Sequence, residues 1–91
     1  MDSTNFSDSA LEHKFRLCGS ILAQGRRLVA AGVHGPMFAL LLSRASDILD
    51  EVDEIMLRLH LDADHDSFAR VATMRRELED FQLIVEGSAH Y

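Results

Sequence analysis

The sequence contains little that would cross-link the chain or anchor it in a membrane. Its single cysteine, Cys18, excludes a disulfide framework within the chain and is typical of a reducing compartment. Its longest uninterrupted apolar run, Met37–Leu42, is far shorter than the ~20 residues that span a bilayer. No basic segment followed by an apolar one opens the chain, so we expect no signal peptide. These features predict a cytoplasmic protein that does not bind membranes.

Glycine and proline are also scarce. One proline and five glycines among 91 residues leave few places where a helix must break. A chain of this length forms one domain, 1–91, and buries only about 60–65% of its unfolded surface. Its apolar share of 47% is nevertheless high. We infer that the core is well filled or that some apolar surface serves a partner.

Positive charge is the third scarce property. Nine Lys/Arg residues stand against 15 Asp/Glu residues, for a net charge of −6. This balance argues against direct nucleic-acid binding, which depends on neutralising phosphates. Eight of the nine cations are arginine, a bias typical of GC-rich bacterial genomes. Residues 35–66 hold two cations against eight anions, so the acidity is concentrated in the middle of the chain.

Apolar residues recur at steps of three and four along three segments, the period of amphipathic helices. We predict an all-α fold, an antiparallel up-down-up three-helix bundle that associates into a helical dimer. The helices should cover about 8–32, 36–61 and 67–86, with flexible ends. The middle segment has an apolar face wide enough to pack against two neighbours. That face comprises Phe38, Leu41, Leu42, Ala45, Ile48, Leu49, Val52, Ile55, Met56 and Leu59.

Capping residues predict where the first two helices begin and end. Ser7, or Ser9 with Glu12 in a capping box, can begin the first helix. Gly32 has the place of the left-handed residue that ends it. Pro36 then suits the first position of the second helix, where a missing N–H costs nothing. The short connection makes these two helices antiparallel.

The third helix should be capped by Asp66 or Ser67 and should end at Gly87. Two further glycines, Gly19 and Gly25, fall inside the first helix and cost about 1 kcal/mol each relative to alanine. Close approach of a neighbouring helix would explain them. A local break near Gly25 is the alternative.

Acidic residues between the second and third helices have the spacing of the first EF-hand ligands. Asp62, Asp64 and Asp66 would occupy positions one, three and five of such a loop. Position six is Ser67 rather than glycine, and position twelve is Thr73 rather than the bidentate glutamate. We therefore predict an acidic linker and no calcium site. His60 and His65 flank these aspartates without a third ordered ligand, so we predict no transition-metal site either.

The segment His13–Ser20 resembles histidine phosphotransfer domains, which are also helical bundles. Those domains place lysine three residues after the histidine and glycine four residues after it. Here these positions hold Arg16 and Leu17, and Gly19 comes two residues late. The resemblance implies a phosphotransfer role, which we rank last among the functions considered. We expect neither an enzyme nor a cofactor, and Cys18 reads as a small buried apolar residue.

Two sets of surface residues are candidates for binding a partner. The first is a row of acids on the second helix, which is either solvated or a docking surface for a basic partner. It consists of Asp47, Asp50, Glu51, Asp53 and Glu54. The second is a set of leucines outside the core stripes, which we interpret as a self-association seam. It consists of Leu17, Leu40, Leu57, Leu61 and Leu83.

Our first functional hypothesis is a small helical protein–protein interaction module, of the regulator, adaptor or co-chaperone type. It would act through its helix faces as a homodimer or with a helical partner. The alternative is an acidic mimic that occupies the basic nucleic-acid-binding surface of another protein. The dimer hypothesis rests on the apolar excess, and the mimic hypothesis rests on the acidic row.

Overall fold

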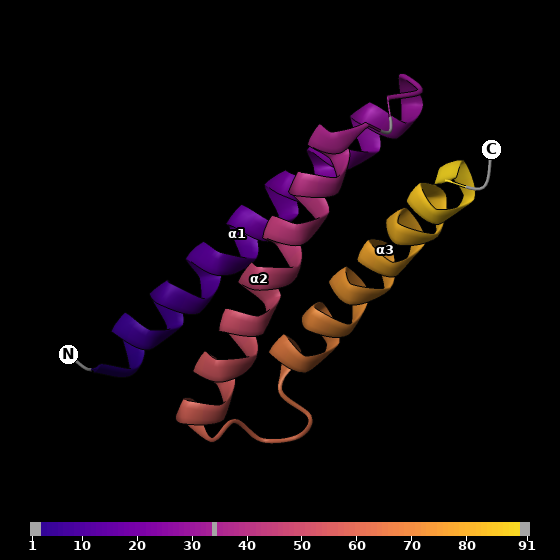
Figure 1. Ribbon diagram of the computed structural model, residues 1–91. Helices are drawn as coiled ribbons and strands as arrows, with labels where there is room; N and C mark the ends of the chain where they lie inside the picture. The colour runs from indigo at the N-terminus through magenta and orange to yellow at the C-terminus, as the bar shows by residue number, and fades with distance from the viewer. Residues whose placement is uncertain (1–2, 34, 90–91) are drawn as a thin grey trace.

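A computed structural model describes residues 3–33 and 35–89 of the chain, and the side chains of residues 9–33 and 35–87. Its elements are α1 (Ser3–Ala30), α2 (Pro36–Leu59) and α3 (Asp66–Ala89). The helices run up, down and up, with the two connections at opposite ends of the molecule (Figure 1). No strand occurs in this part of the chain. The predicted all-α three-helix bundle is confirmed.

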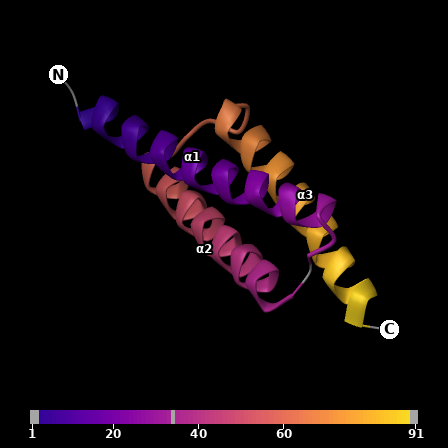
Figure 2. The same cartoon turned by 90° about the horizontal axis from the view of Figure 1, so that it is seen from above.

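All three helices contact one another, and the α1–α2 hairpin forms the most extensive of the three packings. Seen from above, α3 crosses behind α1, so that its first half lies on the side of α1 away from α2 and its C-terminal end emerges on the other side (Figure 2). The molecule is elongated, with principal dimensions of 53 × 21 × 16 Å. The long dimension exceeds the length of the 28-residue α1, about 42 Å, and the molecule is narrow, so each helix keeps a large share of its surface in solvent.

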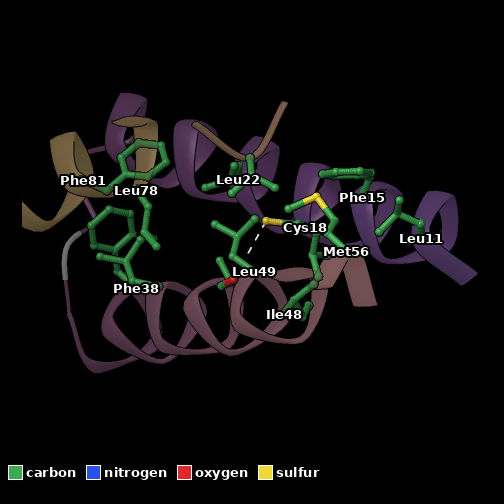
Figure 3. Packing of buried hydrophobic residues seen from close by; sticks show 14 residues of the cluster. Leu11, Phe15, Cys18, Leu22, Phe38, Ile48, Leu49, Met56, Leu78 and Phe81 are labelled. Carbon is green, nitrogen blue, oxygen red and sulfur yellow. Dashed lines mark hydrogen bonds between the residues drawn. The ribbon is translucent and has the colours of Figure 1, made fainter. Parts of the chain in front are cut away.

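The core is built around α2, as its wide apolar face predicted. Fourteen apolar side chains are buried and α2 supplies seven of them, which is why both neighbours must pack on it. The rings of Phe38 and Phe81 meet edge to face with their centroids 5.6 Å apart, joining α2 to α3 (Figure 3). The buried set is Leu11, Phe15, Cys18, Leu22, Phe38, Leu42, Ala45, Ile48, Leu49, Val52, Met56, Val71, Leu78 and Phe81.

The predicted start of the first helix is wrong. Helix α1 begins at Ser3 and runs through Ser7 and Ser9, so neither serine is an N-cap. No proline or glycine between these residues stops the helix from extending. The side chain of Ser7 lies outside the described residues. Glu12 does not close a capping box but reaches Arg70 on α3, so a tertiary contact replaced the local one.

The predicted end of the first helix is confirmed. Gly32 has φ of +77°, the left-handed conformation that glycine adopts without steric cost. The Gly32 N–H donates to the carbonyl oxygen of Val29, and the Val33 N–H donates to that of Leu28 at 2.8 Å. This pair of bonds is a Schellman turn. Pro36 then stands at the start of α2, as predicted.

Both ends of the second connection differ from the prediction, because histidines take the capping positions. Helix α2 ends at Leu59 rather than near residue 61, and His60 follows it in the left-handed conformation with φ of +52°. The Nδ1 atom of His65 accepts a hydrogen bond from the Ser67 N–H at 3.1 Å. His65 is thus the N-cap of α3, and neither Asp66 nor Ser67 is. Helix α3 also continues through Gly87 to Ala89.

The two glycines inside α1 have different surroundings. A Cβ atom at Gly25 would lie 3.2 Å from Cε2 of Phe81 and 3.6 Å from Cε1 of Phe38. A Cβ atom at Gly19 would meet only Cε of Met74, at 3.9 Å. The helix is continuous at both positions. Close approach of a neighbouring helix therefore explains Gly25, and the alternative of a break there is wrong.

We predict opposite effects of alanine at these two glycines. Gly19→Ala should raise the free energy of unfolding by about 0.5–1 kcal/mol, because it gains helix propensity without a clash. Gly25→Ala should lower it, because the Phe81 ring is held against Phe38 and cannot withdraw without losing that contact. Urea denaturation of the two variants measures both effects. An equal gain at both sites would show that Phe81 does not press on α1.

Candidate functional site

The acidic row of α2 forms ion pairs with both neighbouring helices. Arg75 of α3 bridges Asp50 and Asp53, with Nη2 at 3.1 Å and 2.6 Å from their carboxylate oxygens. These bonds and charges raise the pKa of Arg75, so it stays cationic. On the other side of α2, Lys14 of α1 binds Glu51 at 2.7 Å. The row thus carries ion pairs that hold α1 and α3 in register against α2.

The remaining two acids of the row face solvent. Glu54 pairs with Arg58 one turn along the same helix, at 3.4 Å. Asp47 has no ion pair within the described part of the chain. The repulsion among these acids is therefore offset by cations of the same chain. A basic partner is not required to explain the row.

The five predicted seam leucines do not form one surface. Leu40 and Leu57 are 70% and 75% exposed, but they stand 17 residues apart in α2, about 26 Å along the helix. Leu83 is 64% exposed on α3. Leu17 on α1 is only marginally exposed, and Leu61 is half-buried against the core and lines an open hollow.

Sequence reasoning missed three exposed apolar residues. These are Val33 after α1, Met37 in the first turn of α2 and Phe68 in the first turn of α3. All three lie within three residues of a helix terminus, where a stripe of 3.6-residue period does not show which side will be covered. Of the three, only Phe68 could have been found from the sequence pattern, because it flanks the apolar stripe of its helix.

An open hollow of about 600 Å³ lies where the second connection joins α2 and α3. The exposed side chains of Leu57 and Phe68 belong to its wall, and Met56 forms its buried floor. Asp53 and His60 add polar edges. Leu57 therefore belongs to a local apolar recess at one end of the bundle, shared with α3.

A second hollow, of about 540 Å³, lies between α2 and α3 nearer their other ends. Its lining mixes apolar side chains with serines, Asp47, Gln82 and Glu86. Both hollows are open rather than enclosed, and a drug-sized ligand is usually buried over most of its surface. Neither shape favours a small-molecule site.

A third cluster joins α1 to α3. The guanidinium group of Arg70 lies 4.1 Å from the centroid of the Phe15 ring and pairs in bidentate fashion with Glu12, at 3.0 and 3.2 Å. The hydrogen bond and charge of Arg70 lower the pKa of the Glu12 carboxyl group. Arg70, Glu12 and the Phe15 ring therefore interact with one another within the chain. The cluster is explained as a contact between α1 and α3.

The position of Cys18 is unfavourable for nucleophilic chemistry. Cys18 is fully buried between α1 and α2, with its Sγ atom 4.0 Å from the carbonyl oxygen of Ala45 (Figure 3). Burial raises the pKa of this thiol, which disfavours the reactive thiolate. His13 is exposed on α1. Among the described residues, no three His, Cys, Asp or Glu side chains are grouped so that they could hold a metal ion.

Comparison with known proteins leaves the function to be argued from these surfaces. No protein-family model, curated protein or solved structure matches the chain. Within the described helices, none is both long enough and apolar enough to cross a membrane. The geometry offers exposed apolar side chains, two open hollows and an acidic row on α2 that is mostly paired within the chain.

We predict that two aspartates of the row differ in their effect on stability. Asp53→Asn should lower the free energy of unfolding by about 0.5–1 kcal/mol, because Arg75 loses its closest partner. Asp47→Asn is the matched control and should leave stability unchanged or slightly raised, because it relieves repulsion from Glu51 one turn away. Chemical denaturation at low salt measures the difference. Identical effects would show that the Arg75 bridge contributes nothing.

Proposed function

We propose that this protein is a cytoplasmic helical protein–protein interaction module that works as a homodimer, in a regulatory, adaptor or co-chaperone role. It acts by presenting helix faces and not by catalysis. The observation that carries the proposal is the amount of surface the single chain leaves exposed, together with the apolar residues found on it.

The accessible surface of the chain is larger than that of a compact monomer of the same mass. The accessible area is 6286 Å², whereas a compact monomer of 10.2 kDa exposes about 5300 Å². The radius of gyration is 14.9 Å, against about 12 Å for a compact domain of this length. Met37, Leu40 and Leu57 are each at least 65% exposed on this surface. Association would bury area that the monomer cannot cover alone.

Other features support binding over catalysis and over mimicry. The only thiol is buried with a raised pKa, and the hollows are open. An acidic mimic needs carboxylates that are free to meet a basic surface. Here Asp50, Glu51 and Asp53 are bound to Arg75 and Lys14 of the same chain. We therefore do not propose the mimic.

Sedimentation equilibrium tests this function. We expect a mass of about twice the 10.2 kDa of the chain. The dimer should persist in 1 M salt, because burial of apolar area is not screened, whereas exposed charge contacts fade over a Debye length of about 3 Å. A protein that remains monomeric at every concentration would contradict self-association. Dissociation in high salt would show that charge, and not apolar burial, holds the dimer.

A further inference from the structure

The open hollow at the second connection has apolar side chains that solvent can reach. Leu57 of α2 and Phe68 of α3 belong to its lining and are 75% and 40% exposed. Leu61 is half-buried beside them, and the buried Met56 forms the floor. Two helices and the connection between them thus share one apolar recess. We call it the connection hollow.

The shape of the connection hollow suits a helix better than an extended peptide. An extended peptide binds by adding a strand to a free sheet edge, and the described residues contain no strand. A helix satisfies its own backbone and offers only side chains. The α2 residues of the lining run from Asp53 to His60, about 10 Å along the helix. Apolar residues at i, i+4 and i+7 of a partner helix span the same length.

The charge beside the connection hollow is negative. Asp62 directly follows Leu61 of the lining, Asp64 comes two residues later, and both aspartates are exposed. Neither carboxylate forms an ion pair or a hydrogen bond with the described residues. All three Lys/Arg residues from residue 50 to residue 75 already bind acids of this chain. Two free carboxylates therefore adjoin the hollow, and they attract a cationic partner.

The arginines closest to the connection hollow do not cancel this charge. Arg58 lies about 100° or more around α2 from the residues of the lining, and it pairs with Glu54. Arg75 binds Asp53 at the wall, but it also binds Asp50, so one cation stands against two carboxylates. The surroundings of the hollow stay acidic after the internal ion pairs are counted.

The same charges make a second copy of this chain a poor occupant. A two-fold contact centred on the connection hollow would bring Asp62 and Asp64 of one copy close to those of the other. Like charges across an interface disfavour association. The homodimer proposed above would then use other exposed residues, such as Met37 and Leu40. A basic helix gains from the aspartates that a second copy must avoid.

We propose that the connection hollow binds an amphipathic helix of another protein, one whose polar side is basic. The apolar stripe of that helix packs on Leu57 and Phe68, and its arginine or lysine side chains pair with Asp62 and Asp64. This inference goes beyond the proposed homodimer, because each chain carries the whole site and needs no second copy to complete it.

Titration with a designed peptide tests this site. The probe is a fluorescein-labelled peptide of leucine, alanine and arginine, about 18 residues long so that it forms a helix in water, with leucines spaced i, i+4 and i+7. Fluorescence anisotropy should show saturable binding to the full chain. A second peptide with glutamate in place of arginine should bind at least about tenfold more weakly. Equal binding of the two peptides would overturn the basic partner.

Two leucine variants separate the connection hollow from the rest of the surface. Leu57 and Leu40 are exposed on the same helix, at 75% and 70%, but of the two only Leu57 lines the hollow. Leu57→Gln should weaken binding of the arginine peptide at least about tenfold, because an apolar contact is lost. Leu40→Gln should bind as the wild type does. Equal affinities of the two variants, with helical circular dichroism retained in both, would overturn the site.

Two charge variants test the acidic border in the same way. Asp62→Asn with Asp64→Asn removes two charges beside the connection hollow, and the matched control, Glu79→Gln with Asp80→Asn, removes two exposed acids farther along α3. The first pair should weaken binding about threefold or more at low salt, and the control should weaken it less. Identical losses would show that only the net charge of the chain attracts the peptide.

Amide chemical shifts locate the peptide without any substitution. Addition of the arginine peptide to the isotope-labelled protein should shift the signals of residues 53–68 and leave those of residues 36–46 unchanged. Shifts confined to residues 36–46 would overturn the connection hollow as the site.

Sedimentation in parallel keeps this inference separate from the proposed function. A wild-type protein that is monomeric and still binds the arginine peptide would overturn the homodimer and leave the connection hollow standing. A wild-type dimer that does not bind the peptide, and that Leu57→Gln dissociates, would assign the hollow to a second copy. That result would overturn this inference and leave the homodimer standing.

Discussion

The structure depends on burying an apolar face of α2 that is too wide for a single neighbour to cover. Half of the buried apolar side chains come from this one helix. One helix can cover only part of such a face, so α1 and α3 must both pack on it. Close packing then determines details elsewhere. Gly25 lacks a side chain where the Phe38 and Phe81 rings meet, and Cys18 is enclosed opposite Ala45.

Electrostatics reinforces this arrangement at its edges. The acids along the flanks of α2 would repel one another in an isolated helix, but Arg75 and Lys14 neutralise them from the two neighbouring helices. Exposed pairs of this kind contribute little free energy each. They join α2 to both neighbouring helices, so the acidic row takes part in contacts within the fold.

What remains is a surface that this small bundle cannot cover. Three helices of roughly equal length enclose one narrow core, and the outer side of the α1–α2 hairpin has no fourth helix against it. Exposed apolar side chains such as Met37, Leu40 and Leu57 lie on this surface, and the proposed self-association rests on them.

The sequence by itself determined the helical class, the number of helices, the central role of α2 and the Schellman turn at Gly32, because periodicity and glycine placement are local properties. Only the tertiary structure decided which side of each helix meets a neighbour. Tertiary packing made Glu12 the partner of Arg70 rather than a capping residue, and it placed Leu61 half-buried against the core. The cap at His65 was likewise missed, because imidazole is an uncommon N-cap with no signature in the sequence. Residues of one helix that follow the same apolar pattern look alike in the sequence, and only tertiary packing decides which of them are buried.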